Sequence, residues 1–255
     1  MSRYLFLVGT AGCGKTTMTY AFKTWMNSQG FDSITVNLDP GVEELQYEPE
    51  VDVRDWITLE GVMEEYSLGP NGAQIVCADL IALQVREIVQ TLEEFHTDYV
   101  FIDTPGQMEL FAFRESSREI VQVFGGEDSA ILFLLDPQLS RKPSGLISLL
   151  MLSVTTSFRF SIPLINVLSK ADLLSEKEAN AILGWASNSD ALYDALVEEM
   201  GEPSGIPSVG FLGALDEVGA YRGLTPVSSD VLLGFEDLYS LIQICFEGGE
   251  DLSKD

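Results

Sequence analysis

The chain has 255 residues, a length that one open α/β domain can reach. Its 40 acidic residues outnumber its 14 basic residues, and the net charge of −26 disfavours direct contact with nucleic acids or anionic membranes. Because the acids are scattered, a solvated acidic coat of the kind found in halophile-like proteins accounts for them without a special site. Three cysteines, odd in number and far apart, argue against a disulfide framework or a zinc site and fit a reducing cytoplasm.

Six short segments rich in β-branched and aromatic residues alternate with helical patterns. Nearly all their positions are apolar, so both faces are expected to be covered, as in a parallel sheet between helices. The longest apolar tract, at 145–158, is shorter than the ~20 residues that span a bilayer. The pattern predicts one doubly wound α/β domain over 1–246 and a flexible acidic tail at 247–255. The expected strands are 4–8, 33–37, 98–103, 129–136, 162–169 and 224–228.

Seven helices are expected around these strands. The segment at 203–224 is rich in Gly, Pro and Ser and predicts a surface excursion with one short helix. The expected helices are 15–28, 58–67, 73–95, 108–123, 143–158, 175–200 and 234–243.

The segment GTAGCGKTT at 9–17 matches the phosphate-binding pattern G-x-x-x-x-G-K-[ST] between a strand and a helix. Its glycines let backbone amides curl around a β-phosphate, to which the helix start adds its positive end. Lys15 is expected to bridge β- and γ-phosphate oxygens, Thr16 to offer its hydroxyl to Mg²⁺, and Thr17 to lie near the α-phosphate. Cys13 is more simply a small filler than a redox switch. The nucleotide-binding residues expected here are Gly9, Gly12, Cys13, Gly14, Lys15, Thr16 and Thr17.

The segment VNLDPGVEELQYEP at 36–49 follows the second expected strand. Asp39 is placed where a switch loop faces the γ-phosphate, so it is a candidate to bind a metal water or to orient the attacking water. The alternative is a plain Asp-Pro-Gly turn without a catalytic role.

A stiff corner at 67–74, SLGPNGAQ, separates two expected helices. Proline fixes its φ angle, and Gly69 and Gly72 on either side are expected to permit a sharp turn. Asn71 would present an amide that both donates and accepts without carrying charge. On composition alone, an ordinary interhelical turn explains the same residues.

The segment DYVFIDTPGQ at 98–107 contains an expected strand that ends at Asp103 and is followed by a turn at 104–106. Asp103 is a candidate to hold a Mg²⁺ water, and the Gly106 amide is a candidate to contact the γ-phosphate. The alternative is that Asp103 only caps the next helix. Gln107 stands where a water-orienting glutamine is common, but Asp39 is the stronger catalytic candidate.

The segment NVLSKAD at 166–172 decides which base is bound. The carboxylate of Asp172 can accept hydrogen bonds from N1 and N2 of guanine, which adenine does not offer, while the stem of Lys170 covers the ring. Ser169 stands where asparagine is usual, so its tether to the phosphate loop is expected to be shorter. Ser228, in the final expected strand and loop, is a candidate to touch the guanine edge.

Together these segments closely resemble the GPN-loop GTPases, from VGTAGCGKTT through NLDPGVEELQYEP, GPNGA and IDTPGQMELF to NVLSKADLL and PVSS. The resemblance implies a P-loop NTPase fold of the SIMIBI class with helical insertions, and a homodimer. It also implies that Gly69, Pro70 and Asn71 reach into the partner's nucleotide site, where Asn71 approaches the γ-phosphate and the attacking water. Arg54, Arg114 and Arg118 are expected to form ion pairs rather than to serve as an arginine finger.

These expectations describe a cytoplasmic, Mg²⁺-dependent enzyme that binds GTP, hydrolyses it to GDP and changes shape as a dimer. An alternative is an assembly factor whose client, such as an RNA polymerase subunit, matters more than hydrolysis. A small-molecule P-loop kinase is a third possibility, which the guanine-reading residues disfavour.

Overall fold

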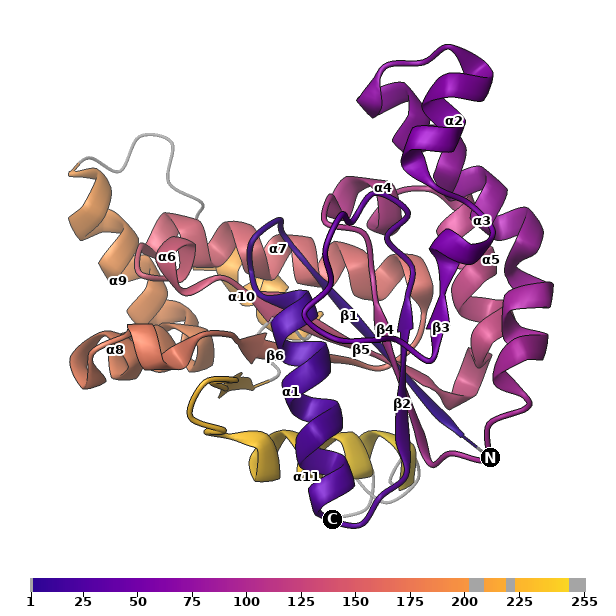
Figure 1. The fold of residues 1–255 in the computed structure, drawn as a ribbon. Coiled ribbons are helices and arrows are strands. Elements are labelled where there is room, and N and C mark those ends of the chain that lie inside the picture. The colour runs from indigo at the N-terminus through magenta and orange to yellow at the C-terminus, as the bar shows by residue number, and fades with distance from the viewer. Residues whose placement is uncertain (1, 202–208, 219–222, 248–255) are drawn as a thin grey trace.

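The computed structural model describes residues 2–201, 209–218 and 223–247. Within them the chain forms one sheet of seven parallel strands in the order β3-β2-β4-β1-β5-β6-β7 (Figure 1). The expected α/β fold, a parallel sheet flanked by helices, is confirmed. The strands are β1 (Arg3–Gly9), β2 (Ser33–Asn37), β3 (Val51–Asp52), β4 (Tyr99–Asp103), β5 (Ser129–Leu135), β6 (Leu164–Leu168) and β7 (Leu224–Pro226).

Helices connect the strands and cover both faces of the sheet (Figure 1). Those up to β5 are α1 (Lys15–Ser28), α2 (Leu59–Tyr66), α3 (Pro70–Leu92), α4 (Met108–Ala112) and α5 (Glu115–Phe124). Those after it are α6 (Pro137–Ser140), α7 (Pro143–Phe160), α8 (Glu176–Ser187), α9 (Ser189–Met200), α10 (Val209–Glu217) and α11 (Phe235–Glu247). Single 3₁₀ turns lie at Val53–Asp55, Gly126–Asp128 and Ala171–Leu173.

The central strand β1 divides the apolar core into two clusters, because successive side chains of a strand point to opposite faces. Leu5 and Leu7 belong to the cluster that includes residues of α1 and α11. Phe6 and Val8 belong to the cluster that includes residues of α3, α5 and α7. Coverage of both faces explains the near-continuous apolarity of the strands.

The parallel register brings the carboxyl ends of the strands to one edge of the sheet. Asp103 at the end of β4 pairs with Leu7 of β1 and with Asn37 of β2. Leu135 at the end of β5 pairs with Leu168 at the end of β6. The loops that carry the sequence motifs therefore start side by side, at the edge where open α/β sheets bind ligands.

Several expected helices differ from the structure, three of them most clearly. Helix α3 begins at Pro70 rather than at 73, because proline is accepted in the first helical position and Gly69 serves as the N-cap. The helix expected over 175–200 is divided at Asn188, whose side chain accepts the amides of Asp190 and Ala191 and so caps α9. The helix expected over 108–123 is divided where Arg114 adopts an extended backbone.

The corner before α3 also differs from the expectation. Gly72 lies inside α3, and the residue with a left-handed backbone is Ser67, with a φ of 52°. The corner is thus made by the end of α2 and the proline start of α3. Figure 1 shows α2 and the first turn of α3 projecting beyond α4, away from the start of α1.

Other expectations meet the structure in part. The short helix expected within 203–224 is α10, whereas 202–208 and 219–222 lie outside the described residues. The expected acidic tail lies outside them as well, except for Glu247 at the end of α11. No helix in the described part of the chain is long and apolar enough to cross a bilayer.

Candidate functional site

The loop between β1 and α1 has the backbone of a phosphate cradle. Gly12 and Gly14 have φ angles of 76° and 99°, which side chains with a Cβ rarely adopt. At Gly9 an added Cβ would lie 2.6 Å from the Leu134 carbonyl oxygen and 2.7 Å from Cys13 Sγ, so only glycine fits. Cys13 is buried and burial raises its thiol pKa, which suits a packing role.

Lys15 links this loop to the loop after β4. Its side chain is buried at the start of α1, and Nζ donates to the carbonyl oxygens of Gly9 at 3.0 Å and Thr10 at 3.3 Å. The same Nζ donates to the Gly106 carbonyl oxygen at 3.4 Å. The ammonium thus lies between the two loops expected to hold the β- and γ-phosphates.

Asp103 is a buried acid at the carboxyl end of β4, with 2% of its surface exposed. Its Oδ2 accepts a hydrogen bond from the Tyr47 hydroxyl at 3.2 Å, whereas Oδ1 is buried without a hydrogen-bond partner. Burial raises the pKa of Asp103 to about 6, although Thr16, Lys15 and Tyr47 oppose the rise. Burial, followed by the Asp103 charge, raises the pKa of Tyr47, which therefore remains a donor.

Thr16 lines the same cavity as Asp103. A hydroxyl beside a carboxylate oxygen that lacks a donor is an oxygen set that suits a hard divalent cation. The unpartnered Oδ1 of Asp103 therefore fits the expected Mg²⁺, which these two residues would hold.

Asp39 is held rigidly by backbone amides. Its Oδ1 accepts from Gly41 at 2.9 Å, and its Oδ2 accepts from Gly106 at 3.1 Å. Asn37 at the end of β2 contacts the Asp39 backbone twice, accepting from its amide at 3.0 Å and donating to its carbonyl at 3.1 Å. The carboxylate thus joins the loop after β2 to the loop after β4.

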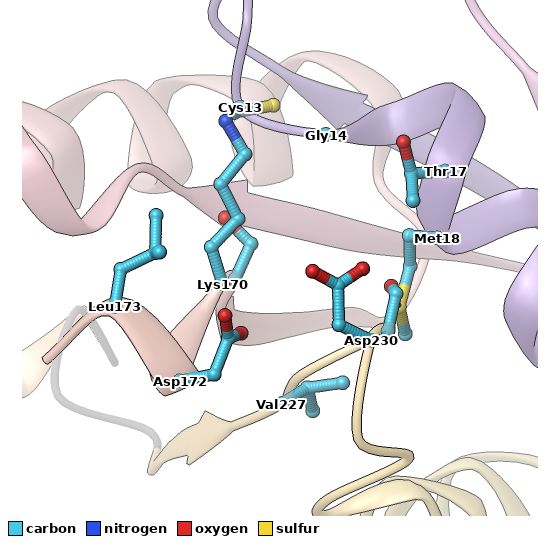
Figure 2. A pocket seen from close by; sticks show the side chains of 11 residues that line it. Cys13, Gly14, Thr17, Met18, Lys170, Asp172, Leu173, Val227 and Asp230 are labelled. Atoms are coloured by element: carbon cyan, nitrogen blue, oxygen red, sulfur yellow. The ribbon is translucent and has the colours of Figure 1, made fainter.

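A second cavity, of about 210 Å³, lies between the start of α1 and the loops after β6 and β7 (Figure 2). Lys170 has a left-handed backbone, with a φ of 49°, and its Nζ donates to the Gly12 carbonyl oxygen. The Lys170 stem passes Gly14 so closely that an added Cβ there would lie 3.2 Å from its Cε. Asp172 and Asp230 also line this cavity (Figure 2).

Two expectations about this cavity were inaccurate. The Ser169 hydroxyl donates to the Leu135 carbonyl oxygen at 3.0 Å, and the bond to the phosphate loop comes from Lys170 instead. Ser228 is fully buried and donates to Oδ1 of Asp172, so it orients that carboxylate rather than lining the cavity. The lining residues after β7 are Val227, Ser229 and Asp230.

Asp230 lines this cavity and was not among the residues expected from the sequence. The sequence places Asp230 only two residues beyond Ser228, which pointed to this loop. Which of the two side chains faces the cavity depends on the backbone turn that they share. That turn is closed by paired backbone hydrogen bonds between Ser228 and Leu233.

The two cavities form one elongated site. The phosphate-side cavity, of about 300 Å³, contains Lys15, Thr16, Asp39, Asp103 and Gly106 among its lining residues. Both cavities are lined by Gly14, Thr17 and Lys170. The site therefore runs from Asp172 at one end to Asp103 and Asp39 at the other.

Gln107 and Asn71 lie outside these two linings. Gln107 is exposed and lines a neighbouring cavity with Asp39 and Gly106. Gly69, Pro70 and Asn71 are exposed at the start of α3 and line neither part of the elongated site. Within one chain, the corner and the site are separate features.

Two of the three singled-out arginines form ion pairs, as expected. Arg114 pairs with Asp79 on α3, with the closest atoms 2.6 Å apart. Arg54 pairs with Asp52 at 2.6 Å and also donates to the Val42 carbonyl oxygen at 3.0 Å. Arg54 is therefore committed to holding the loop after β2.

Comparison with known proteins identifies the family. A family model described as "Conserved hypothetical ATP binding protein" matches residues 7–248. The GPN-loop GTPase PAB0955 of Pyrococcus abyssi is 34% identical over 238 residues, which cover 92% of this chain and 93% of that protein. The chain belongs to the GPN-loop GTPase family.

Other members show how far the likeness extends. The crystal structure of the GTPase PAB0955 in its apo form superposes with a TM-score of 0.80 at 31% identity, covering 96% of this chain and 98% of that one. GPN-loop GTPase 1 of Schizosaccharomyces pombe is 28% identical over 83% of this chain, which spans only 58% of that longer protein.

Proposed function

We propose that this GPN-loop family member is a Mg²⁺-dependent GTPase that acts as a homodimeric switch. The observation that carries the proposal is the elongated site, with Asp172 fixed by Ser228 at one end and Lys15, Thr16 and Asp103 at the other. Asp172 supplies the acceptor for guanine N1 and N2, and the Lys170 stem supplies an apolar cover. This base preference favours GTP over the ATP in the family model's description.

The phosphate end matches the demands of phosphoryl transfer, in which positioning and charge stabilisation dominate. Backbone amides of the loop at 9–14 bind the β-phosphate, and Lys15 neutralises charge between the β- and γ-phosphates. When bound, Mg²⁺ supplies further charge neutralisation on the phosphate oxygens. Thr16 and Asp103 are the residues that would hold it.

Asp39 and Gly106 act on the γ-phosphate side. We assign Asp39 to orienting the attacking water, because its two oxygens are fixed by amides at the edge of the phosphate cavity. The Gly106 amide then contacts the γ-phosphate, and Gln107 assists nearby. Exchange of that amide between Asp39 and phosphate would couple nucleotide state to loop position.

Asn71 completes the site in the partner chain. Its exposed position at the proline-fixed start of α3, outside the linings of its own chain's site, supports action in trans. Arg54 and Arg114 are engaged in ion pairs, so neither is placed as a finger. An uncharged amide from the partner takes that place in the proposed mechanism.

The proposal is tested by following phosphate release from GTP and from ATP, with and without Mg²⁺, while light scattering reports the assembly state. We expect turnover of GTP at least about tenfold faster than that of ATP, since loss of guanine-specific hydrogen bonds costs more than 1.4 kcal/mol. We also expect two chains per particle and no turnover with EDTA. Equal use of ATP, or turnover without a divalent cation, would contradict the proposal.

A further inference from the structure

The segment after the switch loop, residues 46–50, is attached to one side of α1. Thr17 Oγ1 donates to Gln46 Oε1 at 3.3 Å, and the ring of Tyr20 stacks on the ring of Tyr47 with centroids 6.3 Å apart. Further along, Lys23 forms an ion pair with Glu50. Since residues three apart lie on neighbouring positions of a helix surface, Thr17, Tyr20 and Lys23 form one continuous strip.

From this segment Tyr47 reaches the acid at the end of β4. The Tyr47 side chain is nearly buried, with 8% of its surface exposed, and its hydroxyl donates to Asp103 Oδ2. The other oxygen of the same carboxylate is buried and has no hydrogen-bond partner. One oxygen is therefore committed to Tyr47 and the other is left for a ligand in the cavity.

A donor fixed on one oxygen restricts rotation of the carboxyl group about the Cβ–Cγ bond. Partners of this kind orient metal-binding carboxylates and tune their affinity for the ion. We propose that Tyr47 is a positioning residue that directs Asp103 Oδ1 toward the divalent cation of the nucleotide site. This inference rests on the proposed Mg²⁺ dependence, and it adds a residue from the segment after the switch loop to the metal site.

The substitution Tyr47→Phe isolates the hydroxyl, because it keeps the ring, its burial and its stacking on Tyr20. The matched control is Tyr20→Phe, which removes a hydroxyl from the other ring of the stacked pair, at a side chain that is 47% exposed. If Tyr47 only packs against α1, both variants should behave as the wild type does in Mg²⁺ titrations.

The readout is the free Mg²⁺ concentration that halves the release rate of a fluorescent GDP analogue, with GTP turnover measured over the same Mg²⁺ range. Loss of an outer partner of a metal ligand typically costs 10–100-fold in metal affinity, so we expect Tyr47→Phe to raise this concentration at least about tenfold. Turnover should recover at high Mg²⁺, and Tyr20→Phe should match the wild type.

An unchanged Mg²⁺ midpoint in a folded Tyr47→Phe protein overturns the inference and leaves the proposed function intact. A wild-type protein whose GDP release and turnover ignore Mg²⁺ would overturn both. Should Tyr47→Phe not fold, Glu50→Gln, which removes the ion pair between the same segment and Lys23, replaces it. A raised midpoint in that variant supports the inference, and an unchanged midpoint overturns it.

Discussion

The carboxylate of Asp39 accepts a hydrogen bond from the backbone amide of Gly106 at 3.1 Å. These residues belong to different loops, after β2 and after β4, and both line the phosphate cavity. One amide proton cannot serve a carboxylate and a phosphate oxygen at full strength. Binding of a γ-phosphate to Gly106 would therefore free one oxygen of Asp39, which would then be open to accept a hydrogen bond from the attacking water.

Replacing Asp39 by Asn should impair hydrolysis more than binding. An amide keeps the size of the side chain but lacks the charge and basicity needed to orient and deprotonate water. We expect single-turnover GTP cleavage to fall about 100-fold or more, a typical contribution of a positioned base, with GTP affinity changed only a few fold. Asp32→Asn, at an exposed residue before β2, is the charge-matched control. If the cleavage rate and the GTP affinity fell by the same factor, Asp39 would have a structural role and no catalytic one.

Replacing Asp172 by Ala should weaken recognition of guanine while leaving the phosphate loop unchanged. Hydrogen bonds to a charged group are worth about 1.5–3 kcal/mol, so GTP affinity should fall about tenfold or more. The affinity for inosine triphosphate, which lacks the 2-amino group, should fall less than the affinity for GTP. Calorimetry with both nucleotides measures the difference. Ser228→Ala should give a smaller loss in the same direction, because it only releases Asp172. Undiminished preference for GTP over the inosine nucleotide in Asp172→Ala would refute this assignment.

Glu50 joins the segment after the switch loop to α1 and β2. It accepts from Lys23 and from the Thr35 amide at 2.7 Å and hydroxyl at 2.9 Å. Burial acts to raise the pKa of Glu50, but the hydrogen bonds from Lys23 and Thr35 outweigh it and hold the pKa below the ordinary 4.5. A lowered folded-state pKa stabilises the fold above the unfolded-state pKa, and this contribution is lost as the pH falls through the folded value.

We therefore expect Glu50→Gln to lower the free energy of unfolding by about 1–2 kcal/mol at neutral pH, measured in urea. The difference from the wild type should stay constant from about pH 7 to about pH 6 and should shrink below about pH 4.5. A difference that persists undiminished in acid would show that the charge of Glu50 is unimportant.

Most of the fold and much of the site follow from local sequence patterns. The strand that ends at Asp103 is marked by a continuous apolar run. The loop that leads to Lys15 is marked by a spacing of glycines that fixes its backbone. The break at Asn188 was missed because an asparagine within a long helical pattern does not show whether it caps a new helix. The two-residue strand β3 is too short to show any period.

Contacts between distant segments account for the rest of what was missed. Tyr47 and Asp103 are 56 positions apart, and Ser228 and Asp172 are also 56 apart. Which side chain of a loop faces a cavity depends on how the loop packs. Ser228 was therefore expected at the cavity, whereas Asp230 lines it. Only the three-dimensional arrangement separates the residues that line the site from those that hold the lining in place.

The central claim, that Asn71 acts on the nucleotide of a partner chain, is tested most directly by mixed dimers. Asn71→Ala and Lys15→Ala chains with different tags are co-expressed, and dimers that carry both tags are isolated. In these dimers the site of the Asn71→Ala chain has an intact nucleotide pocket and receives Asn71 from its neighbour. If Asn71 acts in trans, these dimers should hydrolyse GTP at about half the wild-type rate, because one of two sites works, while both parent homodimers stay impaired. A mixed dimer no more active than its parents would contradict the account.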